Sequence, residues 1–357
     1  MIEERGAVLA PLFWRDLMKD RFPFRSYVLF TLALIAVMLL CICVGSVSVP
    51  LEKTVTVLWN TLWGLPMPEG VSANIIVNVR LPRVLNVALM GAALSLCGAA
   101  MQGLLRNPLA DGSTLGVSSG ASLGAVIALV FGITIPGTNY SGVMLMAMLF
   151  AFGSLVLILS LAYVLDRSLS TNSIILIGVI FSMFVSSAMS LLISFADDHV
   201  RSITFWTMGS LSGTNYSQAK ILTLALAVCG GVILHYSREL NAFAIGEDNA
   251  RHIGVNVKRV KLVILVAISV LIGVCVSIGG TIGFVGLVIP HMARMVAGPN
   301  HRRLLPATLF SGAIFLLLAD LVARTLLRPV ELSIGMVTSM IGAVAFVVIF
   351  YRSRKVR

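Results

Sequence analysis

Residues 239–261, ELNAFAIGEDNARHIGVNVKRVK, form the longest polar interruption in the second half of the chain. The stretches on either side of it, 221–237 and 262–293, contain no Lys, Arg, Asp or Glu. Gly246 and Gly254 lie eight residues apart inside the interruption. Its apolar residues recur at roughly helical spacing, at Ala242, Ile245, Ala250 and Ile253. A short amphipathic helix followed by a turn fits this pattern, and composition alone leaves an ordinary basic loop as the alternative.

The composition around this segment is that of an integral membrane protein. Hydrophobic residues make up 58% of the chain, charged residues 11%, and the mean hydropathy is +0.99. A water-soluble domain needs more polar surface than this composition supplies. A net charge of +11 is then explained by cytoplasmic Lys and Arg rather than by a nucleic-acid partner. The five cysteines lie inside apolar runs and indicate buried side chains, not disulfides or a metal site: Cys41, Cys43, Cys97, Cys229 and Cys275.

Polar turns divide the apolar sequence into ten predicted spans, a number that 357 residues can accommodate at about 20 residues per span. The eighth span is rich in Gly and is interrupted by Pro290. Residues 50–78 contain Trp59 and Trp63 and are predicted to be an external segment with a short interfacial helix. The spans are predicted at about 27–47, 84–105, 115–133, 143–165, 172–195, 218–236, 261–277, 279–298, 304–323 and 333–351.

The distribution of basic residues gives the orientation. With both termini in the cytoplasm, 19 of the 26 Lys and Arg residues fall on the cytoplasmic side, as the positive-inside rule requires. The predicted organisation is a cytoplasmic N-terminal segment (1–26), a ten-span domain (27–352) and a basic cytoplasmic tail (353–357). The seven external basic residues are Lys53, Arg80, Arg83, Arg201, Lys220, Arg324 and Arg328.

The sequence offers no catalytic chemistry of its own. None of its lysines follows a Gly, so it has no Walker A motif for ATP, and no group of His, Cys, Asp and Glu has metal-ligand spacing. Charges deep within the spans are nearly absent, which disfavours an ATP-independent secondary transporter or channel. Asp320 and Arg324 are spaced i,i+4 and are predicted to form a local ion pair.

Small residues are dense in the second and third predicted spans. They permit close approach of helix backbones, so tight helix packing is the main prediction, and a smooth pathway wall is the alternative. The residues are Gly91, Ala92, Ser95, Gly98 and Ala99 in the second span, and Gly116, Ser119, Gly120 and Gly124 in the third.

Several long motifs together resemble one family. They are RLPRVLNVALMGAALSLCGAAMQGLLRNPLADGSTLGVSSGA (80–121), FWTMGSLSG (205–213), GTIGFVGLVIPHMAR (280–294), HRRLLP (301–306), LADLVAR (318–324) and ELSIGMVTSMIGAVAFVVIF (331–350). In this order they resemble the FecCD-type permeases, the membrane subunits of type II ABC importers for ferric siderophores, haem and vitamin B12. Ser333 and Gly112 stand where the family usually has Pro, and both are local backbone changes.

The resemblance implies an all-α polytopic membrane protein with about ten transmembrane helices, both termini cytoplasmic and a BtuC-like permease fold. It implies a transport subunit, not an enzyme, in a bacterial inner or plasma membrane. The implied partners are a second permease subunit (identical or a paralogue), a cytoplasmic ABC ATPase dimer and an extracytoplasmic substrate-binding protein. No cofactor is expected on this chain, because ATP-Mg is used by the partner ATPase. A ferric siderophore is the most frequent family substrate, and haem and cobalamin remain open.

The resemblance also assigns roles to residues. The loop at about 239–261 matches the family's coupling segment, which docks into the ATPase, with Gly246, Glu247, Ala250, Arg251, Gly254 and Val255 as the coupling residues. External arginines that meet acidic residues of the binding protein are matched by Arg80, Arg83 and Arg324, with interfacial anchoring as the alternative for the first two. The region that narrows the pathway on the cytoplasmic side is matched by Ser170, Thr171 and Asn172.

Overall fold

The computed structural model describes residues 23–45, 49–66, 71–112, 115–135, 142–167, 170–196 and 199–355. Every regular element in these ranges is helical, as the sequence predicts. The predicted N-terminal segment lies almost wholly outside the described residues, as do residues 356 and 357 of the predicted tail.

Within the described residues, ten apolar helices overlap the ten predicted spans. Seven are long and apolar enough to cross a membrane: α2 (Phe24–Cys43), η1 with α5 (Ile75–Arg80 and Leu81–Leu104), α7 (Gly142–Leu165), α8 (Thr171–Ser194), α10 to α11 (Tyr216–His235), α14 (Val257–Gly279) and α16 (His301–Thr325). Three contribute shorter apolar stretches: α6 (Val117–Val130), α15 (Val285–Ala297) and α17 (Ile334–Lys355). The eighth span is therefore shorter than predicted, because Gly280 has a positive φ and the helix resumes only at Val285.

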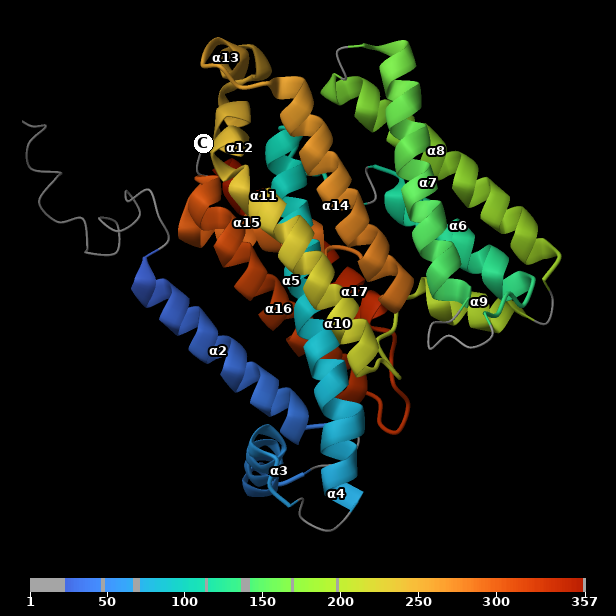
Figure 1. Ribbon diagram of the computed structural model, residues 1–357, viewed down its shortest axis with the longest axis vertical. Helices are drawn as coiled ribbons and strands as arrows, with labels where there is room; N and C mark the ends of the chain where they lie inside the picture. The colour runs from blue at the N-terminus through green and yellow to red at the C-terminus, as the bar shows by residue number, and fades with distance from the viewer. Residues whose placement is uncertain are drawn as a thin grey trace, which may run out of the picture.

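Helix α5 forms the centre of the larger group of helices. It packs against α10, α14, α15 and α16, and Figure 1 shows it passing between them. Glycines allow this close approach. A Cβ atom on Gly98 would lie 2.5 Å from the Cα of Gly286 in α15, and a Cβ on Gly91 would lie 2.9 Å from the carbonyl carbon of Gly312 in α16. The predicted tight packing of the small residues is confirmed at these two crossings.

Helices α6, α7 and α8 form a smaller group on the other side of α14 (Figure 1). Here α6 packs against both α7 and α8, and α9 (Val200–Thr207) lies beside its end. Gly120 and Gly124 of the third predicted span face α7, since a Cβ on Gly120 would lie 2.6 Å from the Cβ of Ser154, whereas Ser119 contacts α8. Helix α14 contacts α5 on one side and α6 and α7 on the other, so it joins the two groups.

The two ends of the molecule carry different short helices. At one end lie α3 (Leu51–Trp63), which is the helix predicted within 50–78, and α4 (Val71–Asn74). At the other end lie α12 (Ser237–Ile245) and α13 (Glu247–His252) (Figure 1). The polar segment 239–261 therefore begins at the opposite end of the molecule from α3, the predicted external helix.

Candidate functional site

The polar segment contains two short helices separated by a glycine. Helix α12 ends at Gly246, whose φ of 122° and ψ of 150° suit glycine alone, and α13 begins at the next residue. Gly254 follows α13 with a φ of 89°. The prediction of one helix followed by a turn is therefore incomplete, because the chain also bends sharply before α13. The two glycines bound a rigid six-residue helix.

The outer face of α13 is exposed. Arg251 and Asp248 form an ion pair of 3.2 Å between side chains that are 52% and 86% exposed. Ile245 and Ile253, on either side of the helix, are 65% and 67% exposed. Two exposed isoleucines beside a charged helix make a surface suited to a protein partner in water.

The inner face of α13 carries the remaining predicted coupling residues. Ala250 is fully buried, and Val255 is half-buried just beyond the helix. The carboxylate of Glu247 lies 2.6 Å from the ammonium of Lys261 in α14. Glu247 also accepts a hydrogen bond of 3.1 Å from the hydroxyl of Thr171 at the start of α8. The structure thus brings together one predicted coupling residue and one predicted gate residue.

The start of α8 is held by its own capping interactions as well. The side chain of Ser170 accepts a hydrogen bond from the backbone N–H of Ser173. The carboxylate of Asp166 accepts hydrogen bonds of 3.2 Å from the backbone N–H of Ser170 and the hydroxyl of Ser173. Asn172, the third predicted gate residue, is exposed. These local interactions cap the first turn of α8, and the Thr171 hydrogen bond joins that turn to α13.

A second connection joins α12 to α16, and the sequence did not predict it. The amide of Asn241 donates a hydrogen bond of 2.8 Å to the side-chain oxygen of Asn300. Its carbonyl oxygen accepts a hydrogen bond of 2.8 Å from the backbone N–H of His301. The His301 ring is buried against Gly103 at the end of α5. No sequence spacing indicates these contacts, nor the contact between Glu247 and Lys261.

The three predicted docking arginines lie at the other end of the molecule, and all are buried. Arg80, Arg83 and Arg324 are 5%, 9% and 4% exposed. Arg83 donates to Asp320 and to Glu331 at 2.9 and 2.8 Å. The predicted ion pair of Asp320 and Arg324 is confirmed, with 2.9 Å between Oδ2 of Asp320 and Nε of Arg324. The angle between these two groups is not that of a hydrogen bond.

Backbone carbonyls at the end of α2 bind the two other guanidinium groups. Arg80 donates to the carbonyls of Ile42 and Cys43, and Arg324 donates to that of Cys41. These arginines are buried rather than exposed to a partner, because carboxylates and carbonyls of the same chain surround them. Their role in docking a binding protein stays a prediction. Together the three arginines and their partners form a buried network of hydrogen bonds and ion pairs that joins α2, α5 and α16.

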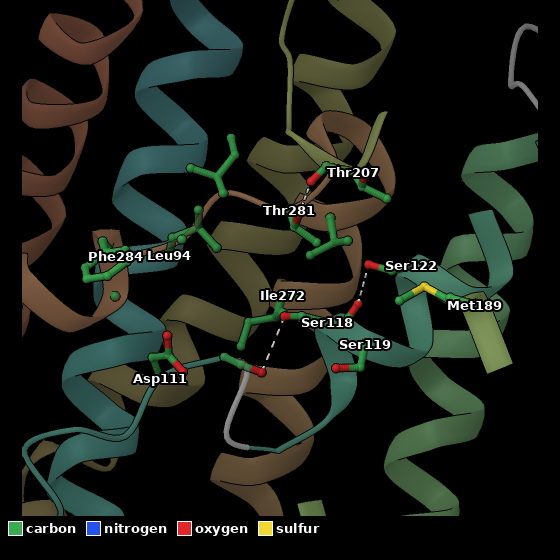
Figure 2. Close-up of a pocket in the computed structure, with 15 residues that line it drawn as sticks. Leu94, Asp111, Ser118, Ser119, Ser122, Met189, Thr207, Ile272, Thr281 and Phe284 are labelled. Atoms are coloured by element: carbon green, nitrogen blue, oxygen red, sulfur yellow. Dashed lines mark hydrogen bonds between the residues drawn. The ribbon is translucent and has the colours of Figure 1, made fainter. Parts of the chain in front are cut away.

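A cavity of about 280 Å³ with a mixed lining lies where α5, α6, α14 and the start of α15 meet (Figure 2). Ser118, Ser119 and Ser122 of α6 line it, together with Asp111. The serine hydroxyls have partners within the chain: Ser122 donates to the carbonyl of Ser118 at 2.9 Å, and Ser119 donates to the hydroxyl of Ser182 at 3.1 Å. Most of the lining is apolar, and the hydroxyls of these three serines are hydrogen-bonded within the chain.

Comparisons with known proteins agree with this architecture. The family model described as the FecCD transport family matches residues 33–352. An uncharacterized ABC transporter permease protein of Bacillus subtilis, YvrB, is 42% identical over 89% of this chain and 90% of its own length. The molybdate import system permease protein MolB of Haemophilus influenzae is 34% identical over 91% and 95%. The hemin transport system permease protein HmuU of Yersinia pestis is 36% identical over 91% and 96%.

A solved structure is similar to almost the whole chain. It is described as an inward-facing conformation of a putative metal-chelate type ABC transporter. The TM-score is 0.80 at 33% sequence identity, and the match covers 92% of this chain and 99% of the other. The helical arrangement is therefore one already known among transport proteins.

Proposed function

The chain belongs to the FecCD transport family and is a membrane-spanning permease of an ABC importer, and within that class we propose that it forms the translocation pathway for a ferric siderophore or a related iron chelate. An external binding protein delivers the chelate. The membrane is the bacterial inner or plasma membrane. The observation that carries the importer part of the proposal is the exposed, glycine-bounded helix α13 at one end of a bundle of this family.

Helix α13 is the docking site for a cytoplasmic ATPase. Its exposed pair of Arg251 and Asp248 and the neighbouring Ile245 and Ile253 offer both charge and apolar surface. The ATPase dimer binds and hydrolyses ATP-Mg, and this chain binds no cofactor of its own. A rigid short helix can pass the closure of the ATPase to the spans as a rigid-body movement.

A second permease subunit completes the pathway, either as an identical chain or as a paralogue. The start of α8, with Ser170, Thr171 and Asn172, narrows that pathway on the cytoplasmic side. The contact of Thr171 with Glu247 supports this assignment, because it places the narrowing next to the ATPase-docking helix.

The binding protein docks at the opposite end, near η1 and the end of α16. Arg80, Arg83 and Arg324 stabilise that surface from within, and Glu331, whose side chain is 34% exposed, lies at its edge. Direct pairing of the arginines with the binding protein would require them to exchange their present carboxylate and carbonyl partners.

The substrate within the class is the finer part of the proposal. The solved relative is described as a metal-chelate type transporter, which supports a chelate. Haem and cobalamin are the alternatives, and relatives named for hemin and for molybdate show how far the substrates of this family vary. An ATP-independent secondary transporter or channel is the alternative from another class.

The test begins with purification of the chain from its own cells in mild detergent and identification of the proteins that copurify. We expect an ATPase with a Walker A motif at equal stoichiometry, together with a binding protein. That binding protein is then titrated with ferrichrome, ferric enterobactin, haemin and cyanocobalamin, and we expect the tightest binding to a ferric siderophore. A chain that purifies alone and moves a solute across liposomes without ATP would overturn the importer assignment.

A further inference from the structure

The strongest unassigned feature is a partly buried contact among three helices, which we call the Glu247 joint and define as Glu247, Thr171 and Lys261. The Lys261 ammonium lies 2.6 Å from Glu247 and 3.5 Å from the Thr171 hydroxyl. Thr171 in turn donates to Glu247 at 3.1 Å. Each residue comes from a different helix: Glu247 from α13, Thr171 from α8 and Lys261 from α14.

Burial makes the ion pair in this joint difficult to separate. The side chain of Lys261 has no exposed surface, and that of Glu247 is 23% exposed. Removing one partner of a buried ion pair leaves the other charge without compensation, which is strongly unfavourable. A displacement of α13 that broke the pair would separate a fully buried ammonium from its carboxylate. Helix α13 and the first turns of α14 are therefore expected to move together.

The start of α8 meets this ion pair through one side chain. Thr171 is half-buried, and its hydroxyl contacts both Glu247 and Lys261. The Thr171 hydrogen bond therefore links the first turn of α8 to an ion pair whose ammonium is fully buried.

We propose that Lys261 is a positioning residue that holds Glu247 against Thr171, so that movement of α13 carries the start of α8 with it. This inference rests on the proposed function, in which α13 meets the ATPase and the start of α8 narrows the pathway. Lys261 acts through its two partners and contacts neither the substrate nor the ATPase.

The first test measures geometry and does not depend on transport. Spin labels are placed at two exposed positions, Asn172→Cys in α8 and Asp248→Cys in α13. We expect one narrow distance distribution for the otherwise unchanged chain and a broad one after Lys261→Met. Arg259→Met is the matched control, because Arg259 is exposed two residues earlier on the same helix. A distribution that Lys261→Met leaves narrow would overturn the joint, whatever the chain transports.

The second test measures coupling in the assembled complex reconstituted with its ATPase and binding protein. We expect Lys261→Met to lower the ratio of substrate imported to ATP hydrolysed by at least about tenfold, with hydrolysis itself largely retained. Thr171→Val, which keeps the ion pair and the side-chain shape, is expected to lower the ratio several-fold. The exchange of Glu247→Lys with Lys261→Glu is expected to restore part of it.

The two tests separate failure of the joint from failure of the proposed function. If the unchanged complex hydrolyses ATP without importing any substrate, the proposed function fails, and the spin-label result still decides the joint. If the unchanged complex imports substrate and Thr171→Val keeps the full ratio, the joint has no role in coupling. Should Lys261→Met fail to assemble, Thr171→Val decides whether the joint couples the helices, because it alters no charge.

Discussion

The crossing of α5 and α15 gives a sharp test of the packing, through Gly98→Ala. A Cβ on Gly98 would lie 2.5 Å from both the Cα and the carbonyl carbon of Gly286, and closer still to the carbonyl oxygen. Carbon atoms in good contact are about 3.5–4.0 Å apart. The two helices would have to separate by about 1 Å, and the obstacle is backbone, which cannot turn aside as a side chain can.

The loss in free energy of unfolding caused by this one methyl group follows from that geometry. Extra atoms in a packed core usually destabilise a protein by about 1–3 kcal/mol. We expect the upper part of this range, because α15 cannot shift without disturbing its contact with α16. For a chain of 357 residues such a loss corresponds to a fall in the unfolding temperature on the order of 3–4 °C.

The assay is thermal unfolding of the purified chain in detergent, followed by the loss of monodisperse protein. Gly153→Ala is the matched control, because Gly153 lies inside α7 and a Cβ there would meet nothing within 4 Å. That variant is expected to be neutral, or more stable by up to about 1 kcal/mol, since Ala restricts the unfolded chain. Unfolding temperatures within about 2 °C of each other for the two variants would refute the close approach of α5 and α15.

Three further predictions concern the ends of the bundle and the cysteines. Asp320→Asn removes the carboxylate that pairs with Arg83 and Arg324, and we expect thermal unfolding to reveal a loss of about 3–5 kcal/mol; a loss below 1 kcal/mol would contradict the buried network. Arg251→Glu reverses an exposed charge on α13 and should reduce the ATPase recovered by copurification while leaving the unfolding temperature unchanged; undiminished recovery would remove Arg251 from the docking surface. A water-soluble maleimide should label the four buried cysteines only after denaturation, and labelling in the native chain would contradict their burial: Cys41, Cys97, Cys229 and Cys275.

The number and order of the spans could be predicted because membrane burial depends on local sequence. A run of apolar residues long enough to cross the bilayer is visible without knowing its neighbours. The eighth span shows the limit of this reasoning. Residues 280–284 are apolar enough to belong to a helix, yet Gly280 and Phe284 both have positive φ, and α15 begins only after them. Hydropathy does not indicate where a helix is interrupted inside the membrane.

Contacts between polar residues could not be predicted, because they join positions that are distant in the sequence. Arg83 is separated from Asp320 by 237 residues and from Glu331 by 248. The i,i+4 pair of Asp320 and Arg324 was predictable, since helix geometry alone brings those residues together. The same difference explains why Glu247 could be placed in the coupling segment while its partner Lys261 could not be identified.

The buried arginines also bear on the orientation of the chain. Three of the seven basic residues predicted outside, Arg80, Arg83 and Arg324, are held by carboxylates and backbone carbonyls of the same protein. The positive-inside rule concerns basic residues that interact with water and lipid headgroups on the side where they remain. Those three have instead become part of the packed interior. The count of 19 predicted cytoplasmic and seven predicted external basic residues therefore understates how unevenly basic residues are distributed between the two surfaces. This stronger bias supports the predicted placement of α13 in the cytoplasm.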